Sequence, residues 1–175
     1  NCRMLHGALS PDAIFVTATG DWKLGGLELL VALPGEKQYF ADRESVMPHQ
    51  YRAPERQSRQ WELLDQPDNA VRMDMFALGR VIEEVFEQAG IRPSAVLESS
   101  IHKLLKDAPH QRIIAQQFSR CPAFKTDFVA TLAALDELTL KTAQEQAQTL
   151  SQVRSKIPSF PAAIAAQKVG PSLAR

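Results

Sequence analysis

Cysteines, net charge and long apolar runs are all scarce in this sequence of 175 residues. Its two cysteines, Cys2 and Cys121, lie far apart and have no Cys-x-x-Cys or Cys/His spacing, which argues against a disulfide framework or a cysteine metal site. We therefore expect free thiols in a reducing compartment. Twenty lysines and arginines balance twenty aspartates and glutamates, so the basic surplus of a protein that binds nucleic acid through phosphates is missing. No stretch approaches the roughly 18 consecutive apolar residues of a membrane-spanning helix.

A glycine-rich phosphate loop is missing as well. The two adjacent glycines within 24–28 (LGGLE) lack the G-x-G-x-x-G spacing, and no helix pattern follows them. Hydrophobic residues make up 45% and charged residues 23% of the sequence, which is typical of one or two globular domains. Because the sequence begins at Asn1, within what reads as part of an element, we expect it to be a piece of a longer chain.

Strand and turn patterns dominate the first part of the sequence. Two short runs rich in β-branched and aromatic residues, within 13–29, flank a turn around Gly20, which predicts a β-hairpin. The following stretch, 30–67, is punctuated by prolines and has no clear period, so we expect a long loop there.

From Asp74 onward the apolar residues recur at helical spacing. The pattern predicts a first helix that ends at Gly90 and a second that starts near Ser94 and stops before Pro109. A short third helix over 110–122 and further helices after it complete the chain. We interpret them as antiparallel helix pairs, as in an α-solenoid, and predict a mostly α fold.

The segment 6–13 (HGALSPDA) resembles the catalytic loop of protein kinases, and 22–28 resembles the strand that leads into their D-F-G motif. The His, Leu and Pro of the loop stand in their expected places. The positions with chemically active side chains in kinases carry other residues: Ala8 for the loop Asp, Ser10 for the Lys, Ala13 for the Asn and Gly26 for the D-F-G Asp.

Phosphoryl transfer depends on positioning and charge more than on covalent help from the protein. The loop Asp orients the acceptor hydroxyl, while the Asn and the D-F-G Asp hold magnesium ions. Alanine and glycine offer no oxygen to a proton or a metal, so we predict no catalytic residue, no metal and no cofactor. The alternative is an atypical kinase in which Glu28, two residues beyond Gly26 on the same face of a continuing strand, holds the metal.

Five further positions match the parts of the kinase pattern that support its helical lobe. By this analogy the Glu of A-P-E pairs with an Arg from a late helix, and the Asp near the start of the central helix holds the catalytic loop. A buried pair of this kind is costly to break from one side. The retained positions are His6, Glu55, Asp74, Gly79 and Arg112.

Taken in order, these motifs resemble the SCY-like family of pseudokinases, also called N-terminal-kinase-like proteins. The resemblance rests on GDWKLGG at 20–26, YRAPE at 51–55 and FVATLAALDELTL at 128–140. Only 30–45 and 57–72 match nothing in that family pattern. The resemblance implies a kinase-like C-terminal lobe at 1–122 followed by HEAT-type helical repeats at 123–175, with the N-terminal lobe outside this sequence.

The resemblance also implies a cytoplasmic scaffold or adaptor without kinase activity, peripheral at Golgi or ER–Golgi membranes. Family members are linked to coatomer-dependent traffic between Golgi and endoplasmic reticulum, through a tail beyond this sequence, and some to nuclear export of transfer RNA. We therefore expect the partners to be proteins, and coatomer in particular. A transfer-RNA export adaptor, which the zero net charge disfavours, and the atypical kinase remain as alternatives. Nucleotide binding stays undecided, because the lobe that would hold ATP lies outside the sequence.

Overall fold

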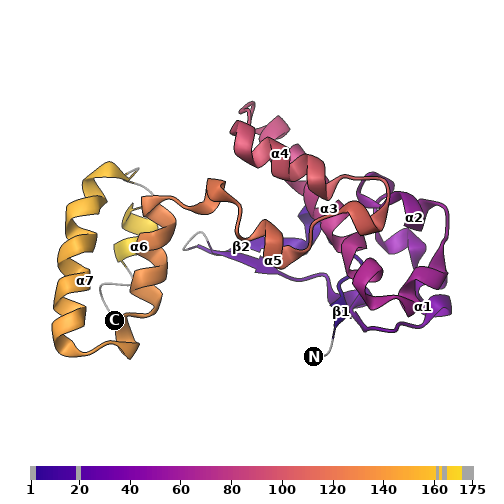
Figure 1. The fold of residues 1–175 in the computed structure, drawn as a ribbon, viewed down its shortest axis with the longest axis horizontal. Helices are drawn as coiled ribbons and strands as arrows, with labels where there is room; N and C mark the ends of the chain where they lie inside the picture. The colour runs from indigo at the N-terminus through magenta and orange to yellow at the C-terminus, as the bar shows by residue number, and fades with distance from the viewer. Residues whose placement is uncertain (1–2, 19–20, 161, 163–164, 171–175) are drawn as a thin grey trace. The chain divides into compact units, whose positions relative to one another are not determined.

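The computed structural model describes residues 3–18, 21–160, 162 and 165–170. The chain falls into two compact units: Asn1–Phe15 with Lys23–Pro122, and Val16–Trp22 with Ala123–Arg175. Helices predominate in both units (Figure 1), which confirms the prediction of a mostly α fold. In the parts of the chain that are described, no helix combines the length and the apolarity needed to cross a bilayer. The assignments of the two units to a kinase-like lobe and to HEAT-type repeats stay predictions.

The described strands form two separate two-stranded sheets. β2 (Ile14–Val16) pairs with β3 (Trp22–Leu24), which confirms the predicted hairpin; Gly20 of its turn lies outside the described residues. β1 (Met4–Leu5) pairs antiparallel with β4 (Val31–Ala32). This second pairing was not predicted, because a strand of two residues is too short to show an alternating pattern.

The stretch 30–67 is not the long loop that the sequence predicted. The chain forms several short helices there. The side chains of two residues in these helices, Phe40 and Leu64, are fully buried in the main core of the first unit. Helices of one or two turns between prolines are too short to display a period, which explains the error. The elements are α1 (Lys37–Asp42), η3 (Glu44–Val46), η4 (His49–Tyr51), α2 (Pro54–Gln57) and η5 (Trp61–Asp65).

The long central helix α3 (Pro67–Gln88) starts well before the predicted Asp74. A proline suits the first turn of a helix because its missing N–H is not needed there. The predicted end is confirmed: Gly90 adopts a left-handed φ of 63°, and the Ile91 N–H donates to the Phe86 carbonyl at 3.1 Å. α3 packs against β1, η4 and η5, and against segments of the first unit that follow it in the chain.

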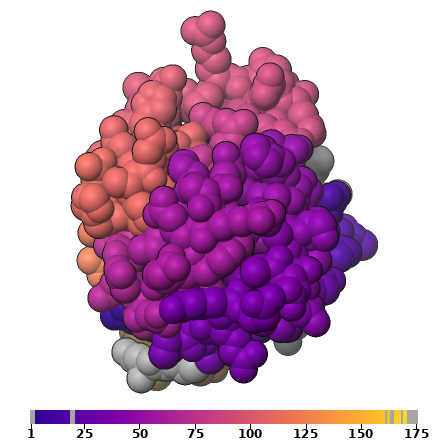
Figure 2. All heavy atoms as spheres, turned by 90° about the vertical axis from the view of Figure 1, so that its right-hand side faces the viewer, coloured from indigo at the N-terminus to yellow at the C-terminus, as the bar shows by residue number. Residues whose placement is uncertain are grey.

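α4 (Ala95–Leu104) begins at its N-cap Ser94, as predicted, and the Ser94 hydroxyl accepts a hydrogen bond from the Leu97 N–H at 3.4 Å. The 3₁₀ turn η6 (Pro109–Gln111) and the single-turn helix α5 (Ala115–Phe118) follow it. Figure 2 shows one face of the first unit, on which the purple and magenta segments from α1 to α3 lie together, with the pink residues of α4 along one edge.

The helical part of the second unit is built on an antiparallel pair, α6 (Asp127–Asp136) and α7 (Ala143–Lys156) (Figure 1). Their shared core contains Leu135, Val153 and Val169. The helical run is interrupted before α7 because Thr142 caps the new helix: its hydroxyl accepts from the Glu145 N–H, while the Glu145 carboxylate accepts from the Thr142 N–H. The shorter turns around the pair are η7 (Pro122–Phe124), η8 (Leu138–Leu140), η9 (Ile157–Ser159) and η10 (Ala165–Val169).

Candidate functional site

His6 and Asp74, two of the retained kinase-pattern positions, meet at the start of the loop that follows β1. The Asp74 carboxylate, on α3, accepts the backbone N–H of His6 at 2.7 Å and that of Gly7 at 2.9 Å. Burial raises the pKa of Asp74, while the hydrogen bonds from these two N–H groups act to lower that pKa. Asp74 thus fixes the backbone of the loop directly to the central helix.

The His6 ring joins the same loop to the segment after β3. Its Nε2 lies 2.8 Å from the Gly25 carbonyl oxygen, which can only accept, so Nε2 carries the proton and donates. Nδ1 is then free to accept the Ala8 N–H at 3.3 Å. Both ring nitrogens are used for backbone contacts, which makes His6 a supporting residue.

Three of the four positions at which the sequence departs from the kinase pattern lie on the loop that follows β1, and the fourth, Gly26, follows β3. Ala8, Ser10 and Ala13 are buried along the loop. Gly26 adopts a left-handed φ of 68°, and a β-carbon placed on it would lie 2.9 Å from the Ala13 Cβ. The two positions that would hold metal in a kinase therefore pack against each other, and neither offers an oxygen from a side chain.

Glu28 does not continue a strand from Gly26, so that part of the prediction was wrong. β3 ends at Leu24, and the left-handed turn at Gly26 leads into the 3₁₀ turn η2 (Leu27–Leu29). One Glu28 carboxylate oxygen still lies 3.6 Å from the β-carbon position of Gly26, although the side chain is exposed. Among the described residues, no group of three or more His, Cys, Asp or Glu side chains is placed to hold a metal ion.

Glu55 and Arg112 form a buried two-pronged ion pair. The Arg112 Nη1 and Nη2 atoms lie 2.6 Å and 2.7 Å from the two Glu55 oxygens, and the side chains are 0% and 2% exposed. Three backbone carbonyls take the remaining donors of the guanidinium, those of Lys106, Asp107 and Arg72. All five N–H groups of Arg112 thus have an acceptor, the condition under which a buried charge is tolerated.

Gly79 lies at the close approach of α3 and α4. A β-carbon there would lie 2.8 Å from Leu105 Cδ2 and 3.1 Å from Leu104 Cβ. The glycine lets the two helices pack closely.

Arg56 is a buried residue that sequence reasoning missed. It follows the A-P-E motif, is 2% exposed, and donates to the Gly7 carbonyl and to Met47 Sδ. Its Nε and Nη2 atoms have no hydrogen-bond partner among the described residues, and burial lowers its pKa to about 10. The guanidinium lies 5.6 Å from the Phe40 ring centroid. Nothing in the sequence distinguishes this arginine from a surface residue.

The contacts of Asp74 and His6 hold the loop that follows β1 in place. Backbone amides, the His6 ring and the Glu55–Arg112 pair organise this region, while Ala8, Ala13 and Gly26 carry small side chains or none. No protein-family model matches the chain, and no solved structure matches it. Curated proteins do match it along nearly its whole length.

Three such relatives point to kinase-like proteins. A probable inactive serine/threonine-protein kinase, scy1, of Dictyostelium discoideum is 25% identical over 182 residues, covering 98% of this chain and 22% of that protein. The mouse (Mus musculus) protein-associating with the carboxyl-terminal domain of ezrin is 23% identical over 97% of this chain and 24% of its own length. A protein kinase domain-containing protein of Schizosaccharomyces pombe is 22% identical over 99% and 27%.

These relatives confirm the resemblance to SCY-like, kinase-like proteins that the motifs predicted. The name of the Dictyostelium protein as an inactive kinase supports the prediction of a pseudokinase. The chain spans between 22% and 27% of the length of the relatives it matches.

Proposed function

We propose that this chain is the helical lobe of a catalytically inactive kinase-like protein, at 1–122, joined to HEAT-type repeats at 123–175, and that it works as a scaffold. The close approach of Ala13 and Gly26 supports the proposal, because the motif match assigns the two metal-binding positions of a kinase to these residues and neither has a side-chain oxygen. The Glu55–Arg112 pair and the Asp74 contacts are intact beside it. Both observations fit a protein that keeps the contacts that shape the lobe but not the side chains that a kinase uses for catalysis.

The partners that fit a SCY-like scaffold best are proteins of the coatomer-dependent route between Golgi and endoplasmic reticulum. We place the protein in the cytoplasm, peripheral at those membranes. The support is the similarity to the scy1 protein and the pair α6–α7, since stacked helix pairs form the extended surfaces that solenoids offer to partners. A transfer-RNA export adaptor is the second candidate, and the atypical kinase that uses Glu28 is the third.

A catalytic test separates the scaffold from the atypical kinase. The purified full-length protein is assayed for Mg²⁺-dependent ATP hydrolysis and autophosphorylation beside its Glu28→Ala variant and, as a matched control, its Glu36→Ala variant. Both glutamates are exposed, and only Glu28 approaches Gly26. The proposal expects neither activity in any of the three proteins. Activity that Glu28→Ala abolishes and Glu36→Ala keeps would establish the atypical kinase instead.

A partner test separates the two adaptor hypotheses. The protein is expressed in cells with a mild affinity tag, and bound proteins and RNA are identified by mass spectrometry and sequencing. Enrichment of coatomer subunits supports traffic between Golgi and endoplasmic reticulum. Transfer RNA or its export factors without coatomer would replace that proposal, and the RNA complex should weaken steeply as salt is raised.

A further inference from the structure

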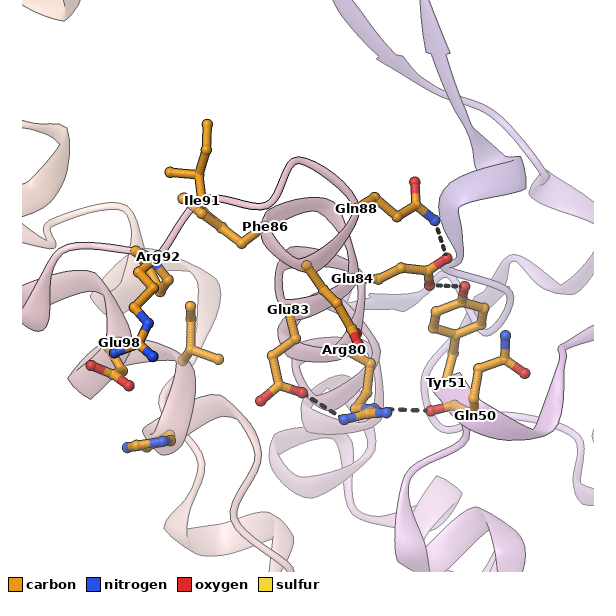
Figure 3. A pocket seen from close by; sticks show the side chains of 14 residues that line it. Gln50, Tyr51, Arg80, Glu83, Glu84, Phe86, Gln88, Ile91, Arg92 and Glu98 are labelled. Carbon is orange, nitrogen blue, oxygen red and sulfur yellow. Dashed lines mark hydrogen bonds and ion pairs between the residues drawn. The ribbon is translucent and has the colours of Figure 1, made fainter.

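A pronounced groove of the described first unit lies outside the loop that carries Ala8, Ser10 and Ala13. It has a volume of about 790 Å³ and lies between η4, the second half of α3 and α4. Figure 3 shows its side chains converging from these three segments. Its apolar part contains Phe86, Ile91 and Ile101, and Ile91 is 61% exposed although it is a large aliphatic residue. The groove therefore offers an apolar contact that the described chain leaves uncovered.

The polar part of the groove carries more negative than positive charge. Four glutamates line it against two arginines, although the whole chain has no net charge. Arg80 is already engaged, since its Nη1 lies 2.5 Å from the Glu83 carboxylate and its Nε donates to the Gln50 carbonyl. With Arg80 and Glu83 paired, the groove is still lined by three glutamates, Glu84, Glu87 and Glu98, and by one further arginine, Arg92.

Glu84 is held in place by neutral donors. Its carboxylate accepts from the Tyr51 hydroxyl and from the Gln88 side chain at 2.8 Å, as the dashed lines in Figure 3 mark. Within the described residues no cation pairs with Glu84, Glu87 or Glu98. A guanidinium could reach such carboxylates in a two-pronged geometry, which lysine cannot reproduce.

We propose that this groove binds a segment of a partner protein in which an arginine stands beside a bulky apolar residue. The arginine complements the surplus of glutamates, and its apolar neighbour covers Ile91 and Phe86. The negative charge of the glutamates repels phosphates, so nucleic acid is a poor occupant of the groove. The inference is independent of whether the chain has kinase activity and of which cellular route it serves.

The test uses fluorescence anisotropy with two labelled probe peptides and the whole chain. One peptide has Arg-Leu pairs in a Gly/Ser background, and the other has Glu-Leu pairs in the same background. The Arg-Leu peptide is expected to bind and the Glu-Leu peptide is not. Binding should weaken severalfold between about 50 and about 500 mM salt, because the groove is open to solvent.

Paired variants locate the binding. Glu87→Gln with Glu98→Gln should weaken the Arg-Leu complex about 3- to 10-fold, and Ile91→Ser should weaken it by a similar factor. The matched control is Glu36→Gln with Glu137→Gln, two exposed glutamates outside the groove, which should leave the affinity unchanged. All substitutions are at exposed positions, so the fold should survive them.

Three outcomes overturn the proposal: no binding of the Arg-Leu peptide, equal binding of the Glu-Leu peptide, or equal affinity in the groove and control variants. Concentration-dependent self-association that the groove variants abolish would also overturn it, since a second copy of the chain would then be the occupant. A failure of the coatomer test leaves the peptide result untouched, so the two proposals fail separately.

Discussion

Arg112 and Glu55, which stand 57 residues apart in the chain, are joined by two parallel N–H···O bonds in the buried part of the first unit. Glu55 belongs to the short helix α2, and Arg112 follows the turn η6. The carbonyl of Arg72, on α3, accepts from the same guanidinium. One side chain thus connects three segments, and the stability of the lobe should depend on it strongly.

Breaking this pair from one side should be costly. Glu55→Ala and Arg112→Ala are each expected to lower the free energy of unfolding by about 3–5 kcal/mol, because each leaves an uncompensated buried charge. The double variant should lose less than the sum of the two. Urea unfolding followed through Trp61, which packs against the buried Phe40, measures the effect.

The exposed pair Lys37–Asp65 provides the comparison. Its side chains are 43% and 56% exposed, so Lys37→Ala should cause a far smaller loss. If the single variants at Glu55 and Arg112 lose no more than Lys37→Ala, the buried pair does not hold the lobe together.

Arg56 should respond differently from Arg112 although both are buried arginines. Among the described residues, two nitrogen atoms of Arg56 have no hydrogen-bond partner, and Asp74 and Glu44 act on its charge only electrostatically, so Arg56→Met removes a charge that is partly compensated. We expect Arg56→Met to change the free energy of unfolding by about 1 kcal/mol or less, in either direction, while Arg112→Met loses about 3–5 kcal/mol. Equal losses in the same urea experiment would mean that Arg56 stabilises the loop through contacts as strong as those of Arg112.

The motif order predicted two contacts between distant segments, Glu55 with Arg112 and Asp74 with the loop after β1, and the structure contains both. The order of His6, Glu55, Asp74 and Arg112 was enough to anticipate that distant segments meet, and the amphipathic part of α3 was visible from its period. The start of α3 was missed, because Asp68, Asn69 and Arg72 interrupt the apolar residues of its first turns and obscure the pattern.

Other features depend on three-dimensional context that a sequence pattern does not carry. Phe40 is buried because Gly7 leaves room for it: a β-carbon at Gly7 would lie 2.8 Å from the Phe40 ring. The burial of Arg56 and the groove beside α3 arise in the same way, from segments that meet only after folding. Periodicity reports which face of one helix is apolar, but not which residue from elsewhere covers it.

Restoring the D-F-G aspartate should not restore a metal site. Gly26→Asp places a β-carbon 2.9 Å from Ala13 Cβ on a backbone with φ of 68°, so the variant should be destabilised and should gain no Mg²⁺ dependence in a thermal-shift assay. Gly90→Asp is the matched control, since Gly90 has a similar φ of 63° but no atom within 4 Å of its β-carbon position. We expect Gly26→Asp to be less stable than Gly90→Asp by about 1–3 kcal/mol.

Equal stability of the two glycine variants would show that the backbone around Ala13 shifts at little cost in free energy to make room for a side chain at position 26. A Mg²⁺-dependent rise in the melting temperature of Gly26→Asp, but not of Gly90→Asp, would show that a metal site persists in latent form.

Alkaline pH should loosen the contact between η4 and α3. Burial, followed by the hydrogen bond to Glu84, raises the pKa of Tyr51 above its ordinary value of 10.0. Because the folded state favours the neutral phenol, its contribution to stability is present in full below about pH 10 and is lost as pH rises through the raised pKa. An ionised Tyr51 would also face the Glu84 carboxylate as a like charge.

The sequence contains two tyrosines, so Tyr39→Phe leaves Tyr51 as the single phenol for an ultraviolet titration. Its absorbance change should be centred above pH 10, and the midpoint should fall toward the ordinary value when Glu84→Gln removes the neighbouring charge. Urea unfolding at successive pH values should show Tyr39→Phe losing stability more steeply above about pH 10 than Tyr51→Phe does. A titration centred at or below pH 10, or parallel stability curves, would contradict the buried Tyr51–Glu84 bond, which also shapes one wall of the proposed peptide groove.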